Sequence, residues 1–105
     1  MDRGIVESKH GVFGILDVRG EVDLSWSQEL RGAVLKALQQ HDALAVRLAA
    51  VDYIDSSGIA ALVEGFQQAR GKQQPFILLT PSPSVRAVLE LARLDRVFQI
   101  REHLD

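Results

Sequence analysis

The hydroxyls of Ser56 and Ser57 are the groups of this chain whose type and spacing best suit a chemical change. They stand between Asp55 and Gly58, and the apolar periodicity beyond them predicts a helix that begins near Ser57. Asp and Ser are good N-caps, and the free N–H groups and dipole of a helix start favour an added dianion. Phosphorylation here would add charge beside Asp55 and switch an exposed surface without changing the core. The alternative is a helix start that is simply well capped.

Gly58 would lie in the first turn of this helix, where a residue without a side chain lets another backbone or surface approach closely. Asp52 and Asp55 could in principle act as an acid and a base. No His and no second motif accompanies them as a nucleophile or an oxyanion donor, so capping of the loop explains them better. We therefore expect no catalytic residue in this stretch.

The three histidines do not form a metal-binding pattern. His10, His41 and His103 are scattered over expected turn and terminal positions, and no spacing puts two of them on one helix face. The chain contains no Cys, which excludes a disulfide framework, a thiolate nucleophile and a Cys-ligated metal centre. We expect neither a metal nor another cofactor.

Length and charge limit the classes of partner. The chain has 105 residues, of which 47% are hydrophobic, and this fits a single domain over residues 1–105 with one core. Lys and Arg number 12 against 14 Asp and Glu, for a net charge of −2. Without a block of Lys and Arg, the chain lacks the positive surface that nucleic-acid binding requires.

The sequence also argues against membrane insertion and secretion. Charges interrupt residues 1–7, so this end does not read as a secretory signal. The longest weakly polar stretch, residues 54–63, is broken by Asp-Ser-Ser and is far shorter than the roughly 20 apolar residues of a membrane-spanning helix. We expect a cytoplasmic protein.

Hydrophobic periodicity predicts the elements that must position the Asp-Ser-Ser-Gly stretch. Ser25 is the expected N-cap of the first helix, and Gln28 would complete a capping box. In chain order, the expected elements are strands at 5–9 and 12–18, a helix from the Ser25 cap to about 40, a strand at 43–49, a loop at 50–55, a helix at 57–70, a strand at 75–80, a helix starting within 81–84 and ending near 92, and a segment at 97–100 that is either an edge strand or a frayed turn.

This order, β-β-α-β-α-β-α with a possible last strand, predicts an α/β fold. Strands separated by helices pair in parallel through right-handed crossovers, whereas the first two form a hairpin. The expected architecture is a mixed sheet of four to five strands with helices packed on it. Residues 20–25 and 52–57 then lie at strand ends, where open α/β sheets commonly carry their functional sites.

Several segments together resemble one known family. Residues 55–59, Asp-Ser-Ser-Gly-Ile, resemble the signature of STAS domains, the sulfate transporter and anti-sigma factor antagonist family. Residues 20–23, Gly-Glu-Val-Asp, resemble that family's Gly-Glu-hydrophobic-Asp pattern, and residues 76–85 and 89–98 resemble its later passages. The likeness covers roughly residues 5–100, and the combination is far more specific than Asp-Ser-Ser-Gly alone.

The resemblance implies an anti-sigma factor antagonist, which is a non-enzymatic partner-switching protein. In such a switch the unphosphorylated antagonist binds an anti-sigma factor that is also a serine kinase. Phosphorylation at Ser56 would end that binding, with Ser57 as the weaker candidate, and a serine phosphatase would reset the switch. The residues that the resemblance implies for the partner-binding surface are Asp23, Asp55, Ser56, Ser57, Gly58 and Ile59.

The resemblance leaves one alternative function open. The apolar residues 59–63 and the passage 91–94 look equally like a STAS subunit of a lipid-transport ABC transporter, which would bind the permease or its ATPase. Two departures from the family pattern concern helix ends: residues 71–74 read Gly-Lys-Gln-Gln where Gly-Gly is frequent, and Arg93 replaces a Gly before Leu94. The sequence does not indicate an oligomeric state.

Overall fold

Five strands form one mixed sheet in the order β1-β2-β3-β4-β5 in the computed structural model, which describes residues 3–104. β1 pairs with β2 in antiparallel fashion and the other pairs are parallel. The elements are β1 (Gly4–His10), β2 (Phe13–Val22), α1 (Ser27–Gln40), β3 (Ala43–Ile54), α2 (Ser56–Gly71), β4 (Phe76–Leu79), α3 (Pro83–Leu91), the short 3-10 helix η1 (Leu94–Arg96) and β5 (Gln99–Arg101). The predicted α/β order and mixed sheet are confirmed, and of residues 97–100 the last two belong to the edge strand β5.

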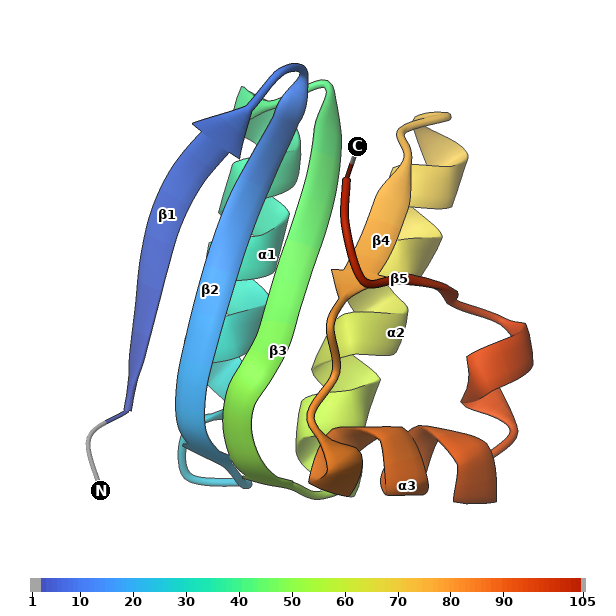
Figure 1. Cartoon of the computed structure of the whole chain (residues 1–105). Coiled ribbons are helices and arrows are strands. Elements are labelled where there is room, and N and C mark those ends of the chain that lie inside the picture. The colour runs from blue at the N-terminus through green and yellow to red at the C-terminus, as the bar shows by residue number, and fades with distance from the viewer. Residues whose placement is uncertain (1–2, 105) are drawn as a thin grey trace.

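The helices α1 and α2 cover one face of the sheet (Figure 1). Between them and the strands lies the main core, because each helix turns one apolar stripe toward the strands. Its fully buried members include Leu16 and Val18 of β2, Leu30 and Val34 of α1, Leu44, Val46 and Leu48 of β3, Leu62 of α2 and Leu78 of β4. Burial of each such side chain stabilises the fold by about 1.5–3 kcal/mol.

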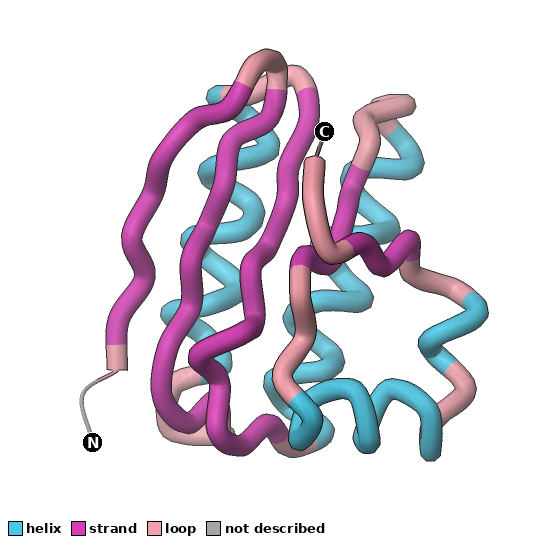
Figure 2. Tube along the Cα trace, in the orientation of Figure 1, coloured by secondary structure: helices cyan, strands magenta, loops and turns pink. Residues whose placement is uncertain are grey.

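Part of the opposite face of the sheet, beside β3 and β4, is covered by the last residues of the described chain (Figure 1). After β5, the chain crosses this face as a loop (Figure 2). Leu104 packs there on a second apolar cluster. Thr80 anchors the loop, because its backbone N–H donates to the Arg101 carbonyl at 2.7 Å and its hydroxyl donates to the Glu102 carbonyl at 3.2 Å. In the described residues, no helix has the length and apolar character needed to cross a membrane.

The predicted loop at residues 50–55 is wrong, because β3 continues to Ile54. Its pairing with β2 extends to the partners Val22 and Ile54, after two register shifts at each of which β3 carries one extra residue. Such irregularities break the strict alternation of side chains that identifies a strand in a sequence. Val51 and Ile54 are nevertheless buried. The sheet therefore carries the chain directly to Asp55.

The predicted capping box at Ser25 and Gln28 is also wrong. α1 begins at Ser27, its N-cap position is Trp26, and no side chain caps it. The Ser25 hydroxyl donates to Oδ1 of Asp23 at 2.6 Å, so it is already engaged in the preceding turn. The backbone N–H groups of Trp26 and Ser27 donate instead to the Asp23 carbonyl, at 3.0 and 2.9 Å.

The two departures from the family pattern both place a residue with a side chain in the left-handed region. Gln73 has φ 58° and Arg93 has φ 60°. A residue other than glycine pays a steric cost there, because its Cβ approaches a backbone oxygen. The structure thus shows why glycine suits these helix ends.

We predict that Gln73→Gly and Arg93→Gly each raise the free energy of unfolding by about 0.5–1 kcal/mol. Relief of roughly 1–2 kcal/mol of backbone strain should exceed the entropy cost of glycine, which is about 0.5–1 kcal/mol. Urea denaturation measures the change. Arg93→Ala is the control, because alanine keeps the strain and should bring no gain. A glycine variant that is no more stable than the wild type would contradict the prediction.

Candidate functional site

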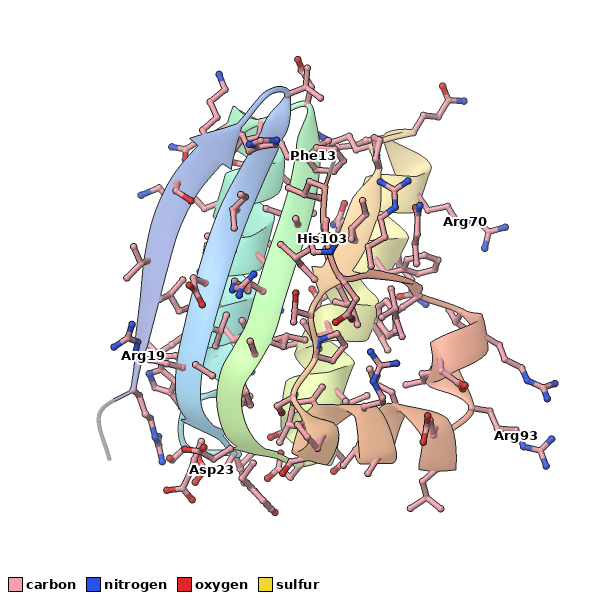
Figure 3. All side chains as sticks on the ribbon, in the orientation of Figure 1. Phe13, Arg19, Asp23, Arg70, Arg93 and His103 are labelled. Carbon is pink, nitrogen blue, oxygen red and sulfur yellow. The ribbon has the colours of Figure 1, made fainter. Side chains whose placement is uncertain are left out.

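Two turns with the same Asp-x-Ser sequence lie side by side at the carboxyl ends of β2 and β3. The first is Asp23-Leu24-Ser25 and the second is Asp55-Ser56-Ser57. The strands before them pair as far as Val22 and Ile54, and the backbone N–H of Asp55 donates to the Val22 carbonyl at 3.2 Å. Asp23 lies at this end of the sheet, as its label in Figure 3 shows. The prediction that both segments lie at strand ends is confirmed.

In the second turn, Asp55 is the N-cap of α2. Its Oδ1 accepts hydrogen bonds from the backbone N–H of Ser57 at 2.9 Å and of Gly58 at 3.3 Å, and from the Ser57 hydroxyl at 2.5 Å. Asp55 rather than Ser56 therefore takes the capping position, and the helix begins one residue earlier than expected. Two N–H groups that the sequence argument left free for a phosphate are already bound to Asp55.

The first turn repeats this geometry around Asp23. Its Oδ1 accepts from the backbone N–H of Ser25 at 3.0 Å and from the Ser25 hydroxyl at 2.6 Å. Arg3 binds both residues of this turn. Its Nη2 donates to Oδ2 of Asp23 at 3.1 Å, and its Nη1 donates to the Ser25 hydroxyl at 3.0 Å. Asp23 thus lies at the same sheet end as Ser56, as the resemblance implies.

The surroundings of both carboxyl groups favour the ionised form. The hydrogen bond from the Ser57 hydroxyl lowers the pKa of Asp55 against the effect of desolvation, and the backbone N–H groups of Gly58, Ser57 and Leu24 act in the same direction. The Ser25 hydroxyl, followed by the charge of Arg3, lowers the pKa of Asp23, which nearby Asp55 opposes. At neutral pH this sheet end therefore carries two carboxylates close together.

The two candidate acceptor hydroxyls have different surroundings. Ser56 is exposed, and within residues 3–104 no group forms a hydrogen bond with its hydroxyl. Ser57 is half-buried and its hydroxyl donates to Asp55. A phosphoryl donor can reach Ser56 directly, whereas reaction at Ser57 requires the bond to Asp55 to break. The geometry favours Ser56, and its phosphorylation stays a prediction.

Gly58 and Ile59 lie behind this surface. A Cβ on Gly58 would stand 2.7 Å from Cγ1 of both Val22 and Ile54, well inside van der Waals contact. The prediction that Gly58 permits a close approach is confirmed, and the surface that approaches is the end of the sheet. Ile59 is only 8% exposed and belongs to the core. Both residues shape the site from beneath, and their part in partner binding stays a prediction.

The sequence reasoning missed Leu24 and Tyr53. The Leu24 side chain is 76% exposed and Tyr53 is 50% exposed, both at this end of the sheet. Leu24 holds the middle position of the first turn, as Ser56 does in the second. The repeated Asp-x-Ser spacing at 23–25 and 55–57 is the signal that could have revealed this equivalence. Among the described residues, no cluster of three or more His, Cys, Asp or Glu could hold a metal ion.

Comparison with protein families places the chain in one of them. Residues 5–105 match the family model described as STAS domain. The match covers both Asp-x-Ser turns and every strand and helix except the first residue of β1.

Solved structures share the fold. An anti-sigma factor antagonist from Mycobacterium paratuberculosis is 25% identical and superposes with a TM-score of 0.89, covering 99% of this chain and 89% of that one. The anti-sigma factor antagonist SpoIIAA in its unphosphorylated form is 20% identical, with a TM-score of 0.76 over 92% of this chain and 87% of that one. The phosphorylated form of the Bacillus protein SpoIIAA is 19% identical, with a TM-score of 0.71 over 92% and 90% of the two chains.

Proposed function

The chain belongs to the STAS domain family, and on this basis we propose that it is an anti-sigma factor antagonist switched by phosphorylation at Ser56. In its unphosphorylated form it binds an anti-sigma factor that is also a serine kinase, and phosphorylation releases that partner. A serine phosphatase restores the binding form. The protein is a non-enzymatic binding module of the cytoplasm, and residues 1–105 form its single domain.

The observation that carries this proposal is the difference between the two serine hydroxyls. Ser56 stands exposed between two groups that are held in place, the Asp55 carboxylate and the Ser57 hydroxyl. The Ser56 hydroxyl can attack the γ-phosphorus of kinase-bound ATP, with ADP as the leaving group and the proton passing to a base of the kinase. Asp23, Asp55, Ser56 and Ser57 then form the face that the kinase meets, over the support of Gly58 and Ile59.

Electrostatics explain how one phosphate would end the binding. Because Asp55 already takes the N–H groups of Ser57 and Gly58, a phosphate on Ser56 does not gain those hydrogen bonds unless it displaces a carboxylate. It would add a charge of about −1.5 to −2 beside Asp55 and Asp23. A partner that covers this turn would have to strip water from the phosphate beside those two carboxylates, which costs free energy that the uncharged hydroxyl did not. Because Ser56 is exposed, we expect the packing of the core behind α2 to stay unchanged.

Phosphate mapping tests this function. We expect incubation with Mg-ATP and a purified serine-kinase anti-sigma factor of the source organism to add one phosphate, located by peptide mass spectrometry on Ser56. Ser56→Ala should lose the modification, whereas Ser57→Ala, the matched control from the same turn, should keep it. Phosphate on Ser57 alone, or none with any such kinase of that organism, would contradict the proposal.

A further inference from the structure

Leu24 is an exposed apolar side chain in a position equivalent to that of the acceptor serine. It follows Asp23 in one turn as Ser56 follows Asp55 in the other, and the strands before the turns are hydrogen-bonded neighbours. Any protein that covers Ser56 closely therefore also meets Leu24. An exposed leucine has no stabilising role in the fold, because it is 76% open to solvent.

The backbone around Leu24 is held firmly. The Asp23 carboxylate bonds the N–H and hydroxyl of Ser25, and its carbonyl accepts the N–H groups of Trp26 and Ser27. The Ser27 hydroxyl donates to the Leu24 carbonyl at 3.4 Å. Little conformational entropy is lost when a partner binds a side chain carried by such a turn, and this makes the side chain an effective anchor.

The surroundings of Leu24 define the charge of a fitting partner. Asp23 and Asp55 lie in the two turns, and the exposed carboxylates of Glu21 and Asp52 lie on the strand ends that lead into them. Arg3 offsets part of this charge through its ion pair with Asp23 at 3.1 Å. A surface with excess negative charge around an apolar side chain is complementary to a basic rim around an apolar pocket. Exposed Tyr53, which pairs with Glu21 across β2 and β3, adds apolar area on the same strand end.

We propose that Leu24 is the apolar anchor of the partner-binding surface, and that it enters a pocket of the anti-sigma factor whose rim is basic. This inference rests on the proposed function and adds to it which residue carries the binding energy and what chemistry the partner presents. Phosphorylation at Ser56 acts beside this anchor, since the two residues occupy neighbouring turns. The phosphate therefore opposes a contact that Leu24 stabilises.

Leu91 offers a matched control for Leu24. It is 88% exposed, more so than Leu24, and is the last residue of α3. Arg93, two residues beyond it, lies on the opposite side of the view from Asp23 (Figure 3). Truncation of either leucine to alanine removes the same atoms from water-exposed positions, so neither variant should lose stability.

The test measures binding of the purified serine-kinase anti-sigma factor by calorimetric titration. Leu24→Ala should weaken the Kd by about tenfold or more, as truncation of an interface anchor does, and Leu91→Ala should stay within about twofold of the wild type. Binding by the wild type should also weaken as salt concentration rises, because salt screens the contact between carboxylates and basic rim.

The outcomes separate this inference from the proposed function. If Leu24→Ala binds the anti-sigma factor as tightly as Leu91→Ala does, and the kinase still phosphorylates Ser56 in the wild type, the role of Leu24 as an anchor is overturned and the proposed function stands. If binding by the wild type is unaffected by salt, the basic rim is overturned. If no serine-kinase anti-sigma factor of the source organism binds or phosphorylates the wild type, the function fails and the anchor fails with it.

Discussion

Replacing Ser56 with aspartate should weaken binding to the anti-sigma factor by about 100-fold or more, because removing water from a new charge beside the Asp55 carboxylate costs several kcal/mol. The new carboxylate would stand beside Asp55, which caps α2, and near Asp23. Ser56 is exposed and belongs to the first turn of the helix, where a negative charge is tolerated. The melting temperature should therefore stay close to that of the wild type, and titration calorimetry measures the loss of affinity.

Ser8→Asp is the control for this prediction. Ser8 is also exposed, but it pairs with Ile15 toward the hairpin end of β1 and β2, at the opposite end of these strands from the two turns. Ser8→Asp changes the net charge of the protein by the same amount as Ser56→Asp. Unchanged binding by Ser8→Asp would therefore show that the position of the new charge, and not the net charge, weakens binding. A Ser56→Asp protein that binds its partner as tightly as the wild type would contradict the switch. That result would favour the alternative, a STAS subunit of a lipid-transport ABC transporter.

Replacing Gly65 or Gly58 with alanine should lower the free energy of unfolding by about 1–3 kcal/mol each, which is the usual cost of overpacking a core. A Cβ on Gly65 would lie 2.5 Å from Cγ1 of Val34 in α1 and 3.2 Å from Cε1 of Phe76 in β4. A Cβ on Gly58 would push α2 away from Val22 and Ile54. Gly58→Ala should also disturb the Asp55 cap, because the Gly58 N–H donates to that carboxylate. Urea denaturation measures both losses.

Gly32→Ala is the control, because this substitution should raise the free energy of unfolding instead of lowering it. Gly32 lies within α1, and a Cβ there meets no atom within 4 Å. Alanine should therefore stabilise the protein by about 0.5–1 kcal/mol through its higher helix propensity. The account of close packing fails if Gly58→Ala and Gly65→Ala are as stable as Gly32→Ala.

Much of the fold could be predicted because its signals are local. The alternation around residues 5–18 and the three- and four-residue spacing of α1 and α2 depend on neighbours along the chain. The extension of β3 to Ile54 could not be predicted in this way, because it depends on pairing with Val22 across a register shift. The Ser25 cap failed for a similar reason: the turn directs the N–H groups of Trp26 and Ser27 to the Asp23 carbonyl, and the Ser25 hydroxyl to the Asp23 carboxylate.

The sequence by itself determined that residues 55–58 form a capped helix start with two hydroxyls, because capping involves groups within three residues of one another. Only the tertiary structure decided that Ser56 is exposed while Ser57 is half-buried. Only the tertiary structure also placed Leu24 in the neighbouring turn, since parallel pairing brings together segments about 30 residues apart in the chain. The exposure of Ser56 and its closeness to Leu24 both depend on how β2, β3 and α2 pack together, and no local pattern of residues encodes them.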